Sequence, residues 1–296
     1  MIIKPRILVL KADGTNCDEE LAFAFKIAGG DPKIVHVNEL RSEKENLKNY
    51  NILAIPGGFS YGDDIVSGKI LAVELTSFFS EELKKFIERK DTLIIGICNG
   101  FQVLIRTGLL PFRTIGKMQT TLINNDSGHF ECRWINLKIE PNSKCVFLNN
   151  KNTSDGGRLI LSEVEGEAMT PPRWTNNNYI SLQVAHGEGK FFANNKTLTT
   201  IEQSNLLVFR YVDDQGNPTQ KYPENPNGSL NAIAGLCDPT GRILGLMPHP
   251  ERFILKEQHP NWRRLKIKKT FTRRSFSEEG QGLPIFENMI KYVEFA

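Results

Sequence analysis

A cysteine flanked by two glycines is the first candidate for chemistry in this sequence. Residues 96–100, Gly-Ile-Cys-Asn-Gly, have the form G-x-C-x-G, the cysteine counterpart of the G-x-S-x-G nucleophile elbow. The pentapeptide joins an apolar, strand-like run to a helix-like segment over residues 99–107. A sharp turn between the two would place the sulfur of Cys98 at the carboxyl edge of a sheet and at a helix N-terminus, which favours the thiolate. This context favours a nucleophile over a cysteine that is simply buried between strand and helix.

A thiol nucleophile needs a base, and His249 is the strongest candidate among the five histidines. It lies in "LGLMPHPERF", where an apolar strand-like run ends in Pro-His-Pro-Glu. Glu251 follows two residues later, so in an extended segment its carboxylate projects to the same side as the imidazole. Such a carboxylate fixes the tautomer of the base and stabilises its protonated form. The alternative is a histidine on a surface loop.

Acyl transfer also requires N–H donors for the oxyanion. The stretch "PGGFSYGDD", residues 56–64, follows a strand-like run and is rich in glycine, so its backbone N–H groups can face a substrate. We expect the N–H groups of Phe59 and Asn99 to form the donor pair. The alternative is a plain surface turn. A P-loop is excluded because the stretch lacks the G-K-[ST] ending.

The elements that must position these residues alternate along the first hundred residues. Apolar strand-like runs are separated by amphipathic segments, which indicates a parallel sheet covered by helices on both faces. We expect Asn16 to cap the first helix and Ser80 to cap the second. The predicted fold is a three-layer, flavodoxin-like α/β fold with a mostly parallel sheet. The expected strands are 6–11, 33–37, 51–56 and 92–97, and the expected helices are 17–28 and the segment that begins at Ser80.

The second half of the chain has a different character. From Met118 onward strand-like runs dominate, which predicts an added β-rich portion before a last helix near 284–295. Two polar, turn-rich stretches, 149–178 and 213–229, are expected to be surface insertions or lids rather than domains. Residues 252–280 form a basic extension, interpreted either as a solvated surface segment or as a docking face for an acidic or phosphate-bearing partner.

Composition excludes several classes of protein. The net charge of the 296 residues is only +3, too small to indicate binding to nucleic acid, and no apolar run is long enough for a membrane span. The N-terminus lacks the features of a secretion signal, and the five cysteines form no paired framework, so we expect a cytoplasmic protein. His129 and Cys132 form a lone H-x-x-C, too little for zinc, and no metal site is expected.

Six stretches in this order together carry a family resemblance. "GICNGFQ", "IPGGFSYGDD" and "MPHPERF" resemble class I, triad-type glutamine amidotransferases. "DGTNCDEE", "NNDSGHFECRW" and "VAHGEGKF" add a similarity to the glutaminase subunits of phosphoribosylformylglycinamidine synthase. The resemblance implies one amidotransferase domain over residues 1–296, with Cys98 as nucleophile, His249 as base and Glu251 as its orienting carboxylate. It also implies that Gly57 and Gly58 line the pocket and that Gln102 contacts the substrate, the alternative for Gln102 being an ordinary polar residue in the first turn of a helix.

The activity implied by this resemblance is hydrolysis of L-glutamine through a cysteine thioester. The ammonia would pass to a separate ATP-dependent synthetase that makes formylglycinamidine ribonucleotide in purine biosynthesis, with a small accessory subunit in the complex. No cofactor is expected on this chain, because ATP and Mg²⁺ would be held by the synthetase. Two alternatives remain open, a stand-alone cysteine hydrolase of γ-glutamyl or peptide bonds and a non-catalytic binding module. His186 and Glu188 lie in "VAHGEGKF", and the sequence assigns them no chemistry.

Overall fold

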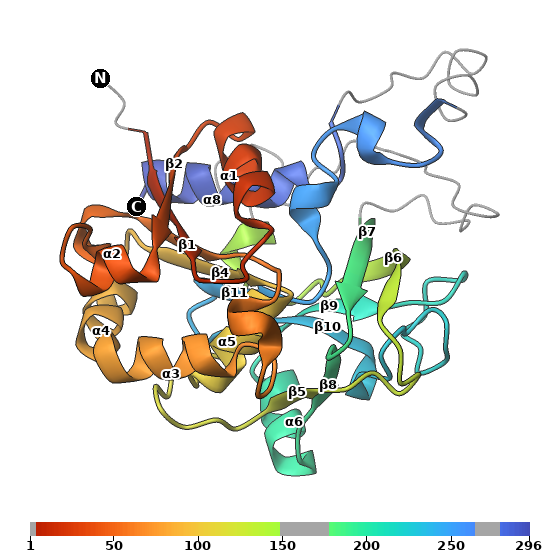
Figure 1. Ribbon diagram of the computed structural model, residues 1–296. Helices are drawn as coiled ribbons and strands as arrows, with labels where there is room; N and C mark the ends of the chain where they lie inside the picture. The colour runs from red at the N-terminus through yellow and green to blue at the C-terminus, as the bar shows by residue number, and fades with distance from the viewer. Residues whose placement is uncertain (1–3, 149–177, 264–278) are drawn as a thin grey trace.

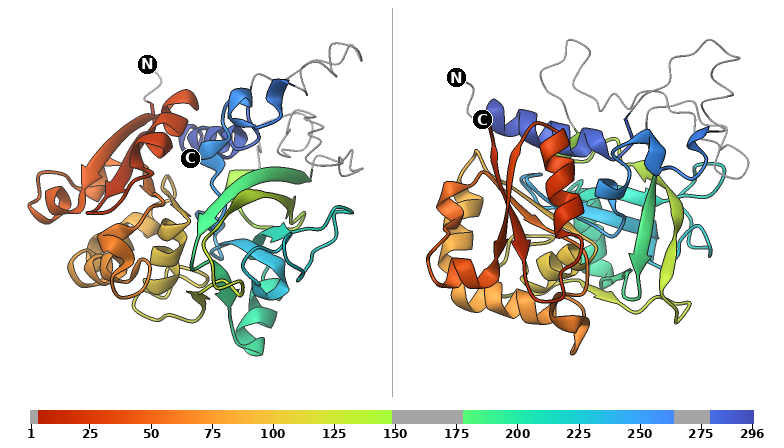
Figure 2. Two further views of the ribbon diagram at one scale, coloured as in Figure 1. Left: turned by 45° about the vertical axis from the view of Figure 1, so that its right-hand side comes forward. Right: turned by 45° about the horizontal axis from the view of Figure 1, so that its top comes forward.

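The computed structural model describes residues 4–148, 178–263 and 279–296 (Figure 1). Within these ranges nine strands form one sheet in the order β2-β1-β3-β4-β11-β10-β9-β6-β7, and β5 and β8 form a separate two-stranded ribbon. Helices cover both faces of the sheet, so the predicted three-layer α/β architecture is confirmed (Figures 1 and 2).

One half of the sheet is parallel, as the strand-like runs of the first hundred residues predict. Its two central strands carry the sequences ILAI and LIIGI and are buried at every position, which is typical of strands covered on both faces. β11, which comes from the C-terminal part of the chain, joins this half by pairing in parallel with β4. The parallel strands are β1 (Arg6–Lys11), β2 (Asp31–His36), β3 (Ile52–Ile55), β4 (Leu93–Ile97) and β11 (Ile243–Leu246).

The other half of the sheet is antiparallel and holds most of the β-rich second half of the chain. It does not stand apart as an added portion, because β10 pairs with β11 and thereby extends the same sheet. β7 alternates between buried and half-buried residues along its length, as a strand with one covered face does. The strands of this half are β10 (Ile233–Cys237), β9 (Leu207–Tyr211), β6 (Glu131–Ile139) and β7 (Tyr179–His186), and the ribbon consists of β5 (Thr121–Ile123) and β8 (Lys190–Phe192).

The helices form the two outer layers. α1 and α8 lie on one face, where the rings of Phe25 and Phe286 pack edge to face with centroids 5.1 Å apart. α3, α4 and α5 lie on the opposite face (Figure 1). The helices are α1 (Asp18–Ile27), α2 (Val37–Arg41), α3 (Lys69–Phe78), α4 (Ser80–Glu88), α5 (Asn99–Arg106), α6 (Asn195–Gln203) and α8 (Leu283–Glu294).

Both predicted helix caps are wrong. The N-cap of α1 is Cys17, and the side-chain oxygen of Asn16 accepts a hydrogen bond from the Cys17 thiol instead of from the helix. The N-cap of α4 is Phe79, and Ser80 is already its first helical residue. Neither N-terminus has a side-chain cap. Acidic residues in the first turn of each helix provide the favourable charge there.

Four neighbouring parallel strands bring distant parts of the sequence to one edge of the sheet. β1, β3, β4 and β11 are adjacent and point the same way, with Ile55 level with Gly96, and Ile97 level with Leu246. The segments that follow these strands therefore meet at the carboxyl edge, the usual ligand-binding edge of such a sheet. Cys98 and the segment that contains His249 are among them.

The segments predicted to be insertions or extensions are only partly at the surface. Residues 213–229 were expected at the surface, but Asn225, Asn227 and Ser229 are at most 1% exposed and lie in the interior. In the described part of the basic extension, Phe253 and His259 are buried against each other. Residues 149–177 and 264–278 lie outside the described residues.

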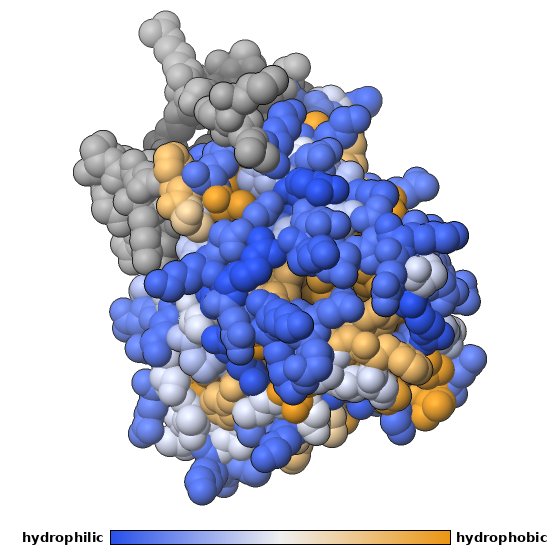
Figure 3. Space-filling view, turned by 90° about the vertical axis from the view of Figure 1, so that its left-hand side faces the viewer, coloured by the Kyte–Doolittle hydropathy of each residue, from blue (hydrophilic) through white to orange (hydrophobic). Residues whose placement is uncertain are grey.

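On the side of the edge strand β2 the surface is largely hydrophilic, with apolar side chains gathered at a few separate places (Figure 3). None of the helices within the described ranges is long and apolar enough to span a bilayer.

Candidate active site

Cys98 occupies the sharp turn between β4 and α5 that the sequence predicts. Its backbone has φ +53° and ψ −105°, a conformation that L-residues rarely adopt and that costs energy unless the surroundings enforce it. The Cys98 N–H donates to the carbonyl of Leu246 in β11 (2.8 Å), and Sγ lies 3.5 Å from the carbonyl oxygen of Ala185 in β7. The residue is 5% exposed. The turn thus holds the sulfur between two strands at the N-terminus of α5.

The two glycines of the elbow are required by close backbone contacts. A Cβ at position 96 would lie 2.5 Å from the carbonyl oxygen of Gly100, and one at position 100 would lie 2.0 Å from the carbonyl oxygen of Ile55. Neither position tolerates a side chain unless α5 moves away from the sheet. The glycines therefore fix the distance between α5 and the strands beneath it.

His249 and Glu251 form a buried pair directly after β11. Nδ1 of His249 is 2.6 Å from Oε1 of Glu251, and both side chains are 1% exposed. The His249 N–H donates to the carbonyl of Gln183 in β7 (2.8 Å), which fixes the backbone at this point. The sequence expectation that Glu251 lies beside the imidazole is met, although the two residues lie at the start of a 3₁₀ turn and not in an extended segment.

The charge state of His249 follows from this pairing. Burial disfavours the imidazolium, but the charge of Glu251, then that of Cys98, and the hydrogen bond to Glu251 outweigh it and raise the pKa of His249 to about 10. At neutral pH the imidazole is therefore protonated. A protonated imidazole in this place can give its proton to a leaving group.

Cys98 and His249 meet across Gly57. A Cβ at position 57 would lie 2.8 Å from Cε1 of His249, 3.2 Å from Sγ of Cys17 and 3.4 Å from Cβ of Cys98. The imidazole and the cysteine thus pack around the space that the missing side chain leaves. A thiol, an imidazole and a carboxylate are thereby gathered in one buried place, which is the set of groups that acyl transfer requires.

Comparisons with known proteins agree with this arrangement. A family model described as the CobB/CobQ-like glutamine amidotransferase domain matches residues 4–178 and 173–293. The phosphoribosylformylglycinamidine synthase subunit PurQ of Dehalococcoides mccartyi is 41% identical to this chain over 290 residues, which cover 98% of each protein. This chain belongs to the PurQ family of glutamine amidotransferases.

A longer synthase chain and a solved structure are also similar to this chain. The phosphoribosylformylglycinamidine synthase of Dictyostelium discoideum is 35% identical over 261 residues, which cover 86% of this chain but 17% of that one. A solved structure titled "Structure of PurLQS from Thermotoga maritima" is similar with a TM-score of 0.59 and 26% identity, covering 92% of this chain and 99% of that one.

The prediction that the N–H of Phe59 is an oxyanion donor is wrong. The N–H of Phe59 donates to the carbonyl of Gly14 (3.1 Å) and does not face Cys98. The preceding residue, Gly58, has φ +121°, and no hydrogen bond from its N–H is found among the described residues. Asn99 is the first residue of α5, where N–H groups have no partner within the helix. The N–H groups of Gly58 and Asn99 are therefore the better candidate pair.

Gln102, predicted to contact the substrate, is held by protein groups at both ends of its amide. Its Nε2 donates to the carbonyl of Glu188 (2.6 Å), and its Oε1 accepts from Nδ2 of Asn99 (3.0 Å). Asn99 in turn accepts a hydrogen bond from the hydroxyl of Ser60 (2.6 Å). This chain of contacts connects the glycine-rich loop, the start of α5 and the "VAHGEGKF" stretch. The role of Gln102 toward glutamine stays a prediction.

His186, to which the sequence assigns no chemistry, lies in a cage of asparagines. Its Nδ1 is 3.1 Å from Oδ1 of Asn125, and its Nε2 is 3.4 Å from Nδ2 of Asn227. An amide oxygen on one side and an amide NH₂ on the other suit a neutral ring with its proton on Nδ1. Burial, and then the charge of His249, lower the pKa of His186 to about 3, so it stays neutral at physiological pH. Asn125 belongs to the "NNDSGHFECRW" stretch, the only signal in the sequence for this cage.

Cys17 of "DGTNCDEE" is a second thiol near Cys98 and His249, and sequence reasoning missed this proximity. Nη2 of Arg252 lies 3.1 Å from its sulfur, while Nε of the same arginine bonds Glu20 at 2.9 Å. Burial and then the charge of Glu251 raise the pKa of Cys17, which favours its neutral thiol over the thiolate. Potential ligand atoms of Cys17, Glu20, His249 and Glu251 lie within 4.8 Å of one another. The guanidinium of Arg252 already supplies the positive charge at this place.

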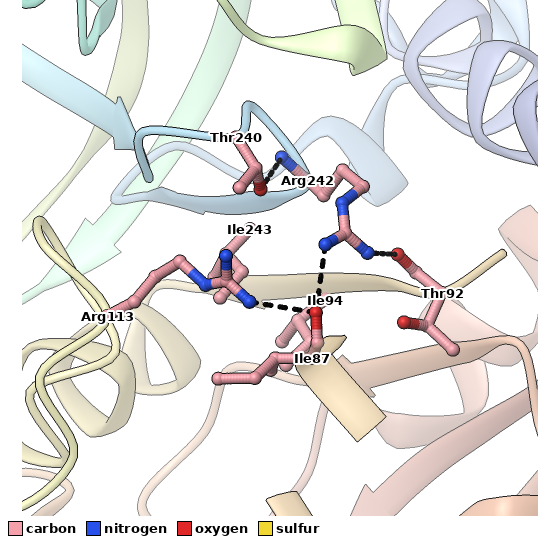
Figure 4. A pocket seen from close by; sticks show the side chains of 7 residues that line it. All are labelled: Ile87, Thr92, Ile94, Arg113, Thr240, Arg242 and Ile243. Atoms are coloured by element: carbon pink, nitrogen blue, oxygen red, sulfur yellow. Dashed lines mark hydrogen bonds between the residues drawn. The ribbon is translucent and has the colours of Figure 1, made fainter. Parts of the chain in front are cut away.

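A cavity at the other end of the parallel strands has no part in this site. It lies at the amino ends of β4 and β11, where Ile94 and Ile243 line it (Figure 4). Arg113 and Arg242 both donate to the carbonyl of Ile87, at 2.8 and 2.9 Å. These arginines bind the backbone of the surrounding loops, so we interpret the cavity as a structural junction on the edge opposite Cys98.

Proposed function

We propose that this chain is the glutaminase subunit of phosphoribosylformylglycinamidine synthase and that Cys98, His249 and Glu251 carry the hydrolysis of L-glutamine. The observation that supports these roles is the convergence of the Cys98 elbow and the His249–Glu251 pair on Gly57. The whole-length similarity to PurQ proteins supports the choice of substrate and of product.

The first half of the reaction forms a thioester. The sulfur of Cys98 attacks the side-chain amide carbon of glutamine, and the N–H groups of Gly58 and Asn99 hold the resulting oxyanion. Protonated His249 gives its proton to the amide nitrogen as the C–N bond breaks, and ammonia leaves. The raised pKa of His249 suits it to this role, because the proton is present at neutral pH. Glu251 holds the ring by its Nδ1–H throughout.

The second half releases glutamate. Neutral His249 takes a proton from water as the water oxygen attacks the thioester carbon. The C–S bond then breaks, Cys98 leaves as thiolate, and the thiolate–imidazolium pair is restored. The same residue is thus acid in the first step and base in the second, as microscopic reversibility requires.

The ammonia is consumed by a second protein. The relative from Thermotoga is named PurLQS, and in Dictyostelium the similar region is a small part of a long synthase chain. We infer that this chain assembles with a synthetase and a small accessory subunit. ATP and Mg²⁺ are assigned to the synthetase, and we place the complex in the cytoplasm, in line with five cysteines of which none forms a disulfide.

The test uses the complex with the synthetase. Cys98→Ala is expected to abolish synthesis of the amidine from glutamine and to leave synthesis from ammonium salts at the wild-type rate. A variant that still uses glutamine would refute the assignment of the nucleophile. Full glutaminase activity of the isolated chain, with no increase in the complex, would instead support a stand-alone hydrolase.

A further inference from the structure

We propose that Glu188 binds the α-ammonium group of the substrate glutamine, with Arg106 beside it for the α-carboxylate. This inference rests on the proposed function, because it concerns how the same site distinguishes glutamine from other amides. Sequence reasoning left Glu188 without a role, and neither the family membership nor the triad accounts for it.

The backbone of Glu188 is docked on the first turn of α5. Its carbonyl oxygen accepts a 2.6 Å hydrogen bond from Gln102, one helical turn beyond Cys98. One turn advances about 5.4 Å along a helix, which is comparable to the length of a glutamine side chain. A substrate whose amide carbon lies at the sulfur and whose chain runs along α5 therefore brings its α-carbon to the level of Gln102 and Glu188.

The loop that carries Glu188 is rigid. Asn125 accepts a hydrogen bond from the Gly189 N–H (3.0 Å), and the amide of the same asparagine donates to the His186 carbonyl (2.8 Å). A Cβ at position 189 would lie 2.4 Å from the His186 ring, so the loop closes tightly on that buried ring. A carboxylate held in this way needs no reordering on binding, as expected of a substrate-positioning group.

The carboxylate of Glu188 is short of hydrogen-bond donors. Its Oε2 is shielded from solvent and accepts no hydrogen bond from any described residue. The nearest cation is Arg106, whose Nη2 is 4.0 Å away, near enough for charge attraction but too far for a hydrogen bond. An ammonium group provides three N–H donors and a positive charge, which is what this oxygen lacks.

Arg106 is placed to complete the recognition of a zwitterion. It is the last residue of α5, and helical side chains lean toward the N-terminus, so its guanidinium is directed back toward Gln102. Its Nε is fixed by the carbonyl of Ser67 (2.8 Å). The side chains of Arg106 and Glu188 are 13% and 23% exposed, so the pair is partly buried but still reachable from solvent. An α-amino acid carries an ammonium and a carboxylate group, which are complementary in charge to Glu188 and Arg106.

The test compares glutamine with its analogue that lacks the amino group, 4-carbamoylbutanoate, in the complex with the synthetase. For the wild type we expect kcat/KM to be at least 100-fold higher for glutamine. Glu188→Gln is expected to reduce that preference at least tenfold, mainly through KM for glutamine, while the analogue is used at nearly the wild-type rate. Glu188→Asp keeps the charge and should keep part of the preference. Glu81→Gln, on the exposed face of α4, is the matched control and should change neither substrate.

Three results would overturn the proposal. Equal losses for both substrates in Glu188→Gln would mean that the residue only supports the loop. A wild-type enzyme that does not distinguish the two amides would refute the proposal without any variant. Loss of glutamine use in Cys98→Ala together with an unchanged preference in Glu188→Gln would reject the α-ammonium site and leave the proposed function intact.

Discussion

Replacing Gly57 by alanine tests the geometry on which the proposed catalytic pair, Cys98 and His249, depends. The new Cβ would lie 2.8 Å from Cε1 of His249, whereas non-bonded carbons prefer a separation of about 3.5 Å or more. The imidazole must therefore move by roughly 0.7 Å or the loop must retreat by as much. Displacement of a reacting group by about 1 Å costs ~100-fold in rate, equivalent to about 2.7 kcal/mol of barrier.

The expected result is a roughly 100-fold loss of glutamine-dependent synthesis in the assembled complex, with ammonium-dependent synthesis retained. The comparison of the two nitrogen sources separates a displaced imidazole from a damaged synthetase. Overpacking of this kind also costs about 1–3 kcal/mol of stability, which a melting curve measures.

Gly29→Ala is the control. Position 29 has φ +98° but open space around its Cβ, so alanine there strains the backbone without touching the site. It is expected to lower the melting temperature and to leave the use of glutamine unchanged. Retention of glutamine-dependent activity within threefold of wild type in Gly57→Ala would refute the argument that the missing side chain positions the imidazole.

Three further predictions follow from charges and close contacts. Glu251→Gln should lower the pKa of His249 from about 10, so that the alkaline limb of the kcat/KM profile for glutamine moves to lower pH; an unmoved limb would contradict the pairing. His186 is neutral in the folded protein and is protonated only on unfolding at acidic pH, so the free energy of unfolding should fall by about 1.6 kcal/mol between pH 6.5 and 5, and denaturant titrations of His186→Gln should show a weaker dependence of this free energy on pH. Gly100→Ala places a Cβ 2.0 Å from a backbone oxygen and should cost ~3 kcal/mol, seen in calorimetry as a clear drop in melting temperature; an unchanged value would mean that α5 shifts freely.

Features that depend on neighbouring residues were predictable. The run before Cys98 is apolar at every position, which predicts a doubly buried strand, and the two glycines around the cysteine predict a sharp turn into a helix. The pairing of His249 with Glu251 was also predictable, because two residues of separation suffice to bring the groups together. The helix caps were not, since a cap depends on the φ and ψ of one residue at the boundary, as at Cys17.

Features that depend on which strands pair were decided by the tertiary structure. Cys98 meets His249 only because β11 inserts beside β4, a pairing between distant segments that no local pattern specifies. The same holds for β7, whose carbonyls contact both residues, and for the loop after it that carries Glu188. The N–H of Phe59 was assigned wrongly because its partner, the Gly14 carbonyl, comes from the segment after another strand.

The sequence by itself determined the elements, the elbow and the chemical types of the triad, because apolar periodicity, glycine content and residue identity act over a few positions. Only the tertiary structure decided which side chains lie close together. Each parallel strand could pair with any of several other apolar strands. The choice among them depends on packing of the whole core.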